Sequence, residues 1–220
     1  MRPRFDHGIS PGLYLITDPL LCAGHDIVGT ALAAVRGGVR IVQLRDKQAG
    51  DGELIRLGRA LRSALADTGA LLIVNDRIEV AAAIGADGVH LGQDDAAVAE
   101  ARAALGPDAL IGLSTHTPAE AAAVDAGVVD YIGIGPVLAT GTKPDHQTPL
   151  GFDGLAAACA ASPVPAVAIG GLKPQHVAPA LRAGAAGIAV VSAICAAPDP
   201  EQAARALIQA AGRERMTRRE

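Results

Sequence analysis

Aromatic residues are nearly absent from this sequence, which has no Trp, two Tyr and two Phe among 220 residues. Half of the chain is apolar, so Ala, Val, Leu and Ile must fill the core. The length suits one mid-sized domain or two small ones, and no Ser- or Pro-rich linker divides it. We therefore expect a single domain over residues 1–220, with flexible tails at about 1–10 and 213–220.

Cysteine is scarce as well. Cys22, Cys159 and Cys195 are far apart in the sequence, and none belongs to a C-x-x-C motif, which argues against zinc and thioredoxin-type chemistry. Three unpaired thiols are typical of a cytosolic protein. Residues 1–10 lack the apolar segment of a signal peptide, and no run approaches the roughly 20 apolar residues of a membrane span. We expect a cytoplasmic protein that does not bind a membrane.

Positive charge is limited too. The formal net charge is −4, which gives no basic footprint for nucleic acid, so small molecules are the expected partners. The three lysines, Lys47, Lys143 and Lys173, all lie in or near predicted strand-to-helix loops. Lysine is a common phosphate binder, which favours a function for Lys47 and Lys143. Chance placement is the alternative, and it is equally good for Lys173.

Short apolar runs alternate with alanine-rich helical stretches along the whole chain. The runs predict strands near 12–17, 40–45, 71–75, 88–91, 109–113, 131–135, 165–169 and 187–191. Helices are predicted near 26–36, 52–66, 77–84, 94–104, 118–125, 151–160, 174–182 and 199–211. Eight such units predict an α/β fold, a single (β/α)₈ TIM barrel with its active site at the carboxyl-terminal rim of the strands. A doubly wound open sheet is the alternative, but Thr17-Asp18-Pro19 stands where its phosphate fingerprint should follow the first strand.

Polar side chains follow the second predicted strand. Gln43, Arg45 and Lys47 alternate with apolar residues and so share one face, which would point into the barrel mouth. An amide, a guanidinium and an ammonium group together suit a polyanion beside a ring that forms hydrogen bonds. The alternative is a solvated strand end with a surface ion pair between Arg45 and Asp46. We favour the site, because polar groups on an inward face need partners.

Two carboxylates follow the next two strands. Asp76 and Asp95 should lie close together, because the axes of neighbouring strands are about 4.8 Å apart. Such a pair repels unless a cation lies between, and Mg²⁺ is commonly held by one or two carboxylates plus substrate phosphates. Helix N-capping is the alternative, for which Asp94 is the better candidate; Asp94 is also an alternative ligand. We favour the metal site.

Ser114-Thr115-His116-Thr117 ends the fifth predicted strand. Its hydroxyl groups could donate to a phosphate, or cap the helix that begins at Pro118, and capping alone explains Thr117. His116 is a candidate acid or base, although a single histidine at a rim is more often a hydrogen-bonding bystander.

Three later segments suit phosphate. Thr140-Gly141-Thr142-Lys143 lies in a long loop that runs to about Gly151, and such loops are often functional. Gly170-Gly171 and Val191-Ser192 end the last two strands, where barrels frequently bind phosphate through backbone amides. Tight packing is the alternative for the glycines. No nucleophile and base are paired in the sequence, so we expect anion binders and a metal rather than a covalent catalyst.

With these residues the chain resembles the thiamine phosphate synthase family over nearly its whole length. The resemblance rests on Gln43-Leu-Arg-Asp-Lys47, Val74-Asn-Asp-Arg77, Gly88-Val-His-Leu-Gly-Gln93 with Asp95, Gly112-Leu-Ser-Thr-His116, Gly135-Pro136-Val137 leading to Thr140-Gly-Thr-Lys143, and Ile169-Gly-Gly171. It implies a (β/α)₈ transferase that joins a pyrimidine diphosphate to a (carboxy)thiazole phosphate and releases diphosphate. The family often has Phe-Pro where this chain has Leu138-Ala139, which bears on loop rigidity and not on the charged groups.

The resemblance also implies roles. It places the pyrimidine diphosphate on Gln43, Leu44, Arg45, Asp46, Lys47, Asn75, Ser114 and Lys143, the thiazole phosphate on Thr140, Gly141, Thr142, Gly170, Gly171, Val191 and Ser192, and the cofactor Mg²⁺ on Asp76 and Asp95. Arg45, Lys47, Lys143 and Ser114 would be catalytic. The pyrimidine–diphosphate bond would break first, fixed positive charges would stabilise the leaving group, and the anchored thiazole would capture the cation.

Two other functions compete with this one. A thiazole tautomerase of the same superfamily would need histidine acid–base chemistry, for which His116 is available, but it would not need the full set of diphosphate-binding groups. A non-catalytic protein that binds phosphorylated metabolites would be favoured by a substitution at Asp76, Asp95 or Lys143, and all three are present.

Overall fold

The computed structural model describes residues 12–22, 26–93, 98–141 and 148–217. Within these ranges, eight parallel strands close into a barrel in sequence order, with β8 paired to β1. The strands are β1 (Gly12–Ile16), β2 (Ile41–Leu44), β3 (Leu71–Asn75), β4 (Gly88–Leu91), β5 (Leu110–Thr115), β6 (Tyr131–Ile134), β7 (Ala166–Ile169) and β8 (Gly187–Val190). The closed barrel confirms the predicted (β/α)₈ fold and excludes the open sheet.

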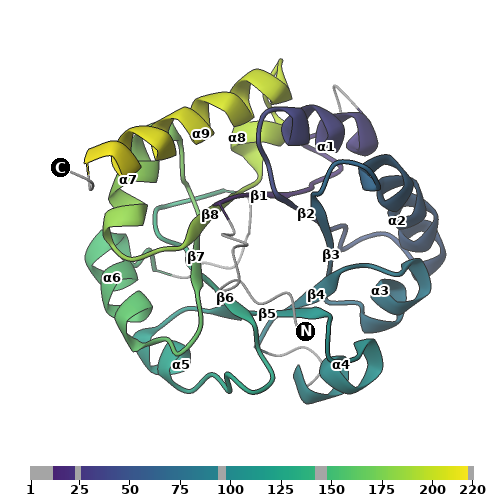
Figure 1. The fold of residues 1–220 in the computed structure, drawn as a ribbon, viewed down its shortest axis with the longest axis horizontal. Helices are drawn as coiled ribbons and strands as arrows, with labels where there is room; N and C mark the ends of the chain where they lie inside the picture. Colours follow the sequence, from purple (N-terminus) through teal and green to yellow (C-terminus); the bar gives the residue numbers. More distant parts are fainter. Residues whose placement is uncertain (1–11, 23–25, 94–97, 142–147, 218–220) are drawn as a thin grey trace.

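Helices surround the barrel as a ring, and each strand is followed by a helix (Figure 1). They are α1 (Ile27–Arg36), α2 (Asp51–Leu65), α3 (Ile78–Ile84), α4 (Val98–Leu105), α5 (Pro118–Ala122), α6 (Gly151–Ala161), α7 (Pro174–Arg182), α8 (Ser192–Cys195) and α9 (Pro200–Thr217). The sequence did not predict α8, and α9 runs past its predicted end at 211. Residues 94–97, at the predicted start of α4, and residues 1–10 and 218–220 of the predicted tails lie outside the described residues.

Local sequence explains where two of the helices begin. The Asp26 carboxylate accepts a hydrogen bond of 2.7 Å from the Gly29 amide at the start of α1. The Thr117 hydroxyl accepts one of 3.1 Å from the Glu120 amide at the start of α5, whose first residue is a proline. The expected capping role of Thr117 is therefore confirmed. Each of these caps stabilises its helix by about 1 kcal/mol.

The core has two layers, because strand side chains alternate between the two faces of the sheet. The outer layer lies between the sheet and the helices and contains Leu44, Leu61 and Val74, all fully buried. The inner layer fills the barrel itself. Its buried members are Tyr14, Ile16, Ile41, Ile73, Leu110, Tyr131, Val167 and Ala189. Both tyrosines of the chain thus lie inside the barrel.

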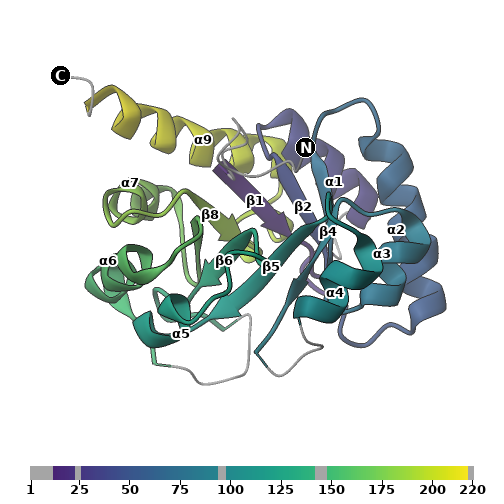
Figure 2. The ribbon, with the colours of Figure 1, turned by 60° about the horizontal axis from the view of Figure 1, so that its bottom comes forward.

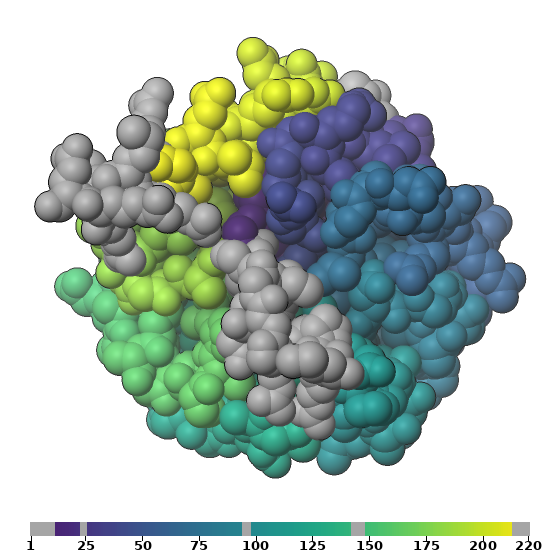
Figure 3. All heavy atoms as spheres, in the orientation of Figure 1, coloured from purple at the N-terminus to yellow at the C-terminus, as the bar shows by residue number. Residues whose placement is uncertain are grey.

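The strands run side by side from one end of the barrel to the other, so their carboxyl ends share one rim (Figure 2). In the space-filling view the colours follow the sequence around the ring, with α9 against α1 (Figure 3). An ion pair of 2.9 Å between Arg36 and Glu201 joins these two helices. Among the described residues, no helix is both long enough and apolar enough to cross a membrane.

Candidate active site

The barrel brings the predicted site residues to its carboxyl-terminal rim, because each lies in the last residues of a strand or just after them. Gln43 is the third residue of β2, Asn75 ends β3, and Ser114 is the fifth residue of β5. Gly170 directly follows β7, and Val191 directly follows β8. Asp94, Asp95, Thr142 and Lys143 lie outside the described residues. The rest of the predicted set comes from β2, β3, β5 and the loops after β6, β7 and β8, which converge on one end of the molecule.

A line of hydrogen bonds crosses the barrel interior between two of these residues. Gln43 Nε2 donates to the Tyr14 hydroxyl (2.8 Å), which is 2.9 Å from the Tyr131 hydroxyl. The Tyr131 hydroxyl lies 3.1 Å from His90 Nδ1, and His90 Nε2 lies 3.0 Å from Ser114 Oγ. We call these five residues the barrel hydrogen-bond chain. Sequence reasoning identified only its two ends, Gln43 and Ser114.

The signal that could have found the middle of the chain is the rarity of aromatics. Two of the four Phe and Tyr residues lie in predicted strands, and both are these tyrosines. Two glycines make room for the rings. A Cβ at Gly112 would lie 2.3 Å from Tyr131 Cζ and 2.4 Å from His90 Nδ1, and a Cβ at Gly133 would lie 3.2 Å from His90 Cε1. Glycine at 112 is therefore a condition for the contact between Tyr131 and His90.

Both tyrosines are neutral inside the barrel. Burial raises the pKa of Tyr14 well above its usual value, although its hydrogen bonds with Tyr131 and Gln43 oppose the rise. Burial also raises the pKa of Tyr131, and the neighbouring Tyr14 raises it further. Desolvation disfavours a buried phenolate, so the two hydroxyl groups remain protonated and can each donate one hydrogen bond.

Arg45 has the clearest unmet requirement at the rim. Its Nε is buried and has no hydrogen-bond partner in the part of the chain that the structure describes. Its backbone amide donates to the Thr17 hydroxyl (3.0 Å). The alternative of an ion pair with Asp46 is wrong, because that carboxylate instead accepts from the backbone amides of Gln48 (2.9 Å) and Ala49 (3.2 Å). A buried N–H without an acceptor is costly, and a ligand oxygen at the rim would satisfy it. The Nε of Arg102, at the other end of the barrel, is also buried without a partner among the described residues.

Asp76 has an unusual backbone. With φ of 62° it is the one non-glycine residue in the left-handed region among the described residues. Its amide donates to the His90 carbonyl (2.9 Å), which ties the end of β3 to β4. Asp76 does not occupy the N-cap position of α3, which belongs to Arg77, so the capping alternative fails here. A strained conformation of this kind costs about 1–3 kcal/mol and clusters at functional sites.

The loops after β6 and β7 are packed against each other. The Val137 amide donates to the Ile169 carbonyl (2.9 Å), and the Leu138 amide donates to the Gly170 carbonyl (3.1 Å). Gly170 and Gly171 have positive φ values of 103° and 66°, and a Cβ on Gly171 would lie 2.6 Å from the Ala139 oxygen. The structure therefore supports tight packing as a reason for both glycines. This packing holds the segment that leads to the exposed residues Thr140 and Gly141.

The loop after β8 contains the unexpected helix α8, with Val191 at its N-cap and an exposed Ser192 at its first position. The helix brings Cys195 to Cys22, so two thiols that are far apart in the sequence are in contact. A hydrogen bond with Cys195 lowers the pKa of Cys22 to about 6, and the same contact raises the pKa of Cys195. This pair lies next to Ile16, whose carbonyl accepts from the Cys195 thiol (3.6 Å).

His116 is held by neighbouring groups. Its Nδ1 lies 2.7 Å from the Gly135 carbonyl, to which it donates, and its backbone amide donates to the Glu120 carboxylate (2.7 Å). The first bond connects the end of β5 to the β6–α6 loop, and the second connects it to α5. They match the bystander interpretation of a rim histidine.

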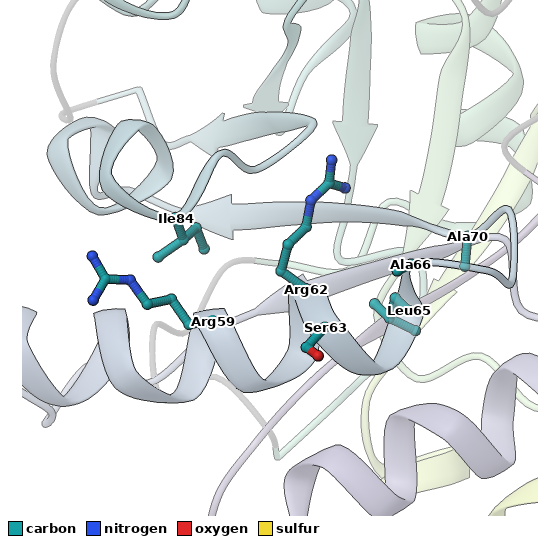
Figure 4. A pocket seen from close by; sticks show the side chains of 7 residues that line it. All are labelled: Arg59, Arg62, Ser63, Leu65, Ala66, Ala70 and Ile84. Carbon is teal, nitrogen blue, oxygen red and sulfur yellow. The ribbon is translucent and has the colours of Figure 1, made fainter.

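A surface hollow of about 430 Å³ lies away from this rim (Figure 4). It is lined by Arg59, Arg62, Ser63, Leu65, Ala66, Ala70 and Ile84. Ala70 precedes β3 and Leu65 ends α2, which places the hollow at the opposite, amino-terminal end of the barrel. The hollow is therefore separate from the candidate active site.

Known proteins resemble this chain along the whole barrel. Residues 13–194 match the family described as thiamine monophosphate synthase. The chain is 56% identical to a thiamine-phosphate synthase of Xanthobacter autotrophicus over 195 residues, which are 89% of this chain and 92% of that protein. It is 51% identical to a thiamine-phosphate synthase of Azorhizobium caulinodans over 201 residues, 91% of this chain and 95% of that one. The solved structure of thiamine phosphate pyrophosphorylase from Pyrococcus furiosus is similar with a TM-score of 0.84 and 33% identity, covering 93% of this chain and 97% of that chain.

Proposed function

The chain belongs to the thiamine monophosphate synthase family, and from this premise we propose its substrates and the roles of its residues. It is a transferase that makes thiamine phosphate. We propose that it couples 4-amino-2-methyl-5-(diphosphooxymethyl)pyrimidine with a thiazole ethyl phosphate, or with its carboxylated form. Diphosphate is the leaving group, and the carboxylated thiazole would also lose its carboxylate as CO₂ after coupling.

The observation that carries the diphosphate assignment is the buried Nε of Arg45, which has no acceptor among the described residues. Leaving such a donor unpaired costs about 1–3 kcal/mol, and a diphosphate oxygen at the rim would accept from it. Lys47 is exposed two residues further on and would add a second positive charge. Lys143, outside the described residues, is proposed as the third.

Asp76 suits a role in holding Mg²⁺, together with Asp95, which is outside the described residues. The donor set fits, since carboxylate oxygens are the protein ligands that Mg²⁺ takes beside substrate phosphates. The strained backbone of Asp76 supports a functional reason for its position. When bound, Mg²⁺ would neutralise part of the charge on the diphosphate.

The proposed reaction begins with cleavage of the bond between the pyrimidine methylene carbon and the diphosphate oxygen, which keeps the electron pair. Arg45, Lys47 and Lys143 stabilise the negative charge that builds on that oxygen, and fixed charges of this kind are usually the largest catalytic term. The amino group of the pyrimidine donates electron density to the methylene cation. Gln43 and Asn75 bind the ring, beside Leu44 and Asp46, and Ser114 donates to the diphosphate.

The thiazole nitrogen then captures the cation, provided that the thiazole is held in line. We propose that its phosphate binds to the loops after β6, β7 and β8, at Thr140, Gly141, Thr142, Gly170, Gly171, Val191 and Ser192. The hydrogen bonds between the β6–α6 and β7–α7 loops support this arrangement, because they keep two of the three segments together.

A thiazole tautomerase is the competing activity. Its acid–base chemistry would use His116, whose Nδ1 donates to the Gly135 carbonyl and whose Nε2 is therefore the acceptor nitrogen in the neutral ring. The deciding experiment mixes the purified protein with both substrates and Mg²⁺ and follows diphosphate release. We expect release only when both heterocycles are present. Tautomerisation of the thiazole alone, without diphosphate release, would contradict the proposal.

A further inference from the structure

The barrel hydrogen-bond chain has a direction, which follows from its first residue. The Gln43 amide nitrogen can only donate, and it donates to the Tyr14 hydroxyl (2.8 Å). Tyr14 has one other hydrogen-bonding neighbour among the described residues, the Tyr131 hydroxyl at 2.9 Å. Since Tyr14 is only 2% exposed, its own hydrogen must be donated to Tyr131.

The direction continues to the other end. The Tyr131 oxygen accepts from Tyr14, and we assign its hydrogen to His90 Nδ1, which lies 3.1 Å away and takes either role according to the tautomer of the ring. A neutral imidazole that accepts at Nδ1 carries its hydrogen on Nε2 and donates there, here to Ser114 Oγ at 3.0 Å. The Ser114 hydroxyl, having accepted from His90, keeps its own hydrogen for another acceptor.

Each end of the chain therefore offers one defined group. Gln43 Oε1 makes no hydrogen bond within the described residues and is left to accept one. Ser114 is left to donate one. The opposite direction would also satisfy the three central residues, but only if the Gln43 amide turned over and four hydrogens moved with it. Gln43 would then offer N–H, and Ser114 could only accept. The two ends thus change together or not at all.

We propose that Tyr14, Tyr131 and His90 are positioning residues that couple recognition of the pyrimidine amino group at Gln43 to recognition of the diphosphate at Ser114. This inference rests on the proposed function. A 4-amino group donates to Gln43 Oε1, and a phosphate oxygen accepts from Ser114, so the true substrate satisfies one direction at both ends. A 4-oxo analogue, which accepts where the amine donates, requires the opposite direction at Gln43 while its diphosphate still requires the first direction at Ser114. The chain makes the enzyme select the amino compound.

The test compares kcat/KM for the amino substrate with kcat/KM for its 4-oxo analogue. Differences in the intrinsic reactivity of the two compounds cancel when this ratio is compared between variants. Tyr131→Phe breaks the chain at its centre and leaves the Gln43–Tyr14 and His90–Ser114 contacts in place. Loss of the Tyr131 hydroxyl frees the Gln43 amide to turn over. We expect the ratio of kcat/KM for the amino substrate to kcat/KM for the 4-oxo analogue to fall about tenfold, which corresponds to the free energy of one ordinary hydrogen bond. Tyr14→Phe should have a similar effect by a different route.

Thr115→Val is the matched control. Thr115 is adjacent to Ser114 in β5 and is fully buried, as Tyr131 is. It donates to the Gly133 carbonyl (3.3 Å) on the other face of the strand. It should lose stability and keep the ratio of the native protein. An unchanged ratio in folded Tyr131→Phe, or an equal fall in Thr115→Val, would overturn the proposal.

A second measurement needs no variant and no turnover. In ¹⁵N NMR of the native protein labelled at histidine, His90 should show an acceptor-type resonance at Nδ1 and a protonated one at Nε2. The reverse pattern would overturn the assigned direction. Failure of the native protein to release diphosphate from the amino substrate would instead refute the proposed function, while the tautomer of His90 would still report on the chain.

Discussion

The two ends of the barrel use arginine and aspartate in opposite ways. At the amino-terminal end, Arg102 donates to Asp130 (2.5 Å) and to backbone carbonyls that include those of Ala109 (2.6 Å) and Val128 (2.8 Å). Asp130 in turn accepts from the Ile111 amide (2.8 Å). The Nε groups of Arg102 and Arg45 are both buried without a partner among the described residues. At the carboxyl-terminal rim, however, Arg45 forms no ion pair with another described residue, and Asp76 has a strained backbone.

The amino-terminal end of the barrel therefore contributes stability, whereas the carboxyl-terminal rim is the candidate site of function. Arg62 and Asp87 repeat the amino-terminal arrangement at β3, where Asp87 accepts from Arg62 (2.9 Å) and from the Leu72 amide (2.8 Å). Such pairs complete the hydrogen bonding of strand beginnings. The rim instead leaves donors and strain that a ligand can satisfy, as expected when catalysis takes place at the carboxyl-terminal face of a barrel.

The largest expected effect is at Arg45. Arg45→Ala removes a positive group aimed at the leaving diphosphate, so kcat/KM for diphosphate release should fall by about 10²–10³-fold. The melting temperature should stay within a few degrees of the native value, since Arg45 has no ion pair within the described residues to lose. Arg62→Ala is the control and should keep full activity. A large drop in stability with near-native activity would show that Arg45 stabilises the fold, as Arg102 does, and does not act in catalysis.

Arg102→Ala should show the reverse behaviour. The side chains of Arg102 and Asp130 are only 13% and 5% exposed, so removing the arginine leaves a buried carboxylate unpaired. We expect the free energy of unfolding, measured in urea, to fall by about 3–5 kcal/mol. The kcat of the fraction that remains folded should be unchanged. If stability is kept and kcat falls instead, the amino-terminal end is not merely structural.

Alkaline pH tests the interior of the barrel. Burial raises the pKa of Tyr14 and of Tyr131 above that of the unfolded chain, so the unfolded state ionises first as the pH rises. The stability is complete below about pH 10 and should fall above it by about 1.4 kcal/mol per pH unit for each tyrosine. Tyr14→Phe should remove one tyrosine's share of this slope. A slope that is the same in the variant would show that Tyr14 is accessible to solvent.

The smallest expected effect is a gain. Asp76→Gly relieves the left-handed backbone at a position with φ of 62°, and it should raise the free energy of unfolding by about 1 kcal/mol. The same variant should lose Mg²⁺-dependent activity, because a proposed ligand is gone. Asp76→Ala should lose the activity without the gain in stability. Comparing the two variants distinguishes the effect of the backbone on stability from the effect of the carboxylate on activity. Retained activity in both variants would remove Asp76 from the metal site.

The sequence allowed the barrel to be predicted because each strand is a short apolar run with a local signal of its own. Strand positions agreed with the structure to within one or two residues, and the rim residues followed from them. The hydrogen bond between Tyr14 and Tyr131 could not be predicted, because it joins residues 117 positions apart that meet only when the barrel closes. Helix α8 was missed because its four residues are too few to show a helical period.

The incorrect alternatives failed for local reasons. Asp46 was a possible partner of Arg45, but its carboxylate caps the turn that leads to α2 by accepting from Gln48 and Ala49. Short-range hydrogen bonds of this kind compete with ion pairs and cannot be read from charge alone. The contact of Cys22 with Cys195 likewise depends on α8, which folds back against the end of β1.

Calorimetric titration with inorganic diphosphate in the presence of Mg²⁺ tests the proposed diphosphate site at Arg45 most directly. The native protein and Arg62→Ala should bind one diphosphate per chain with equal affinity, and Arg45→Ala should bind it roughly tenfold to hundredfold more weakly. Equal affinity in all three proteins would contradict the account.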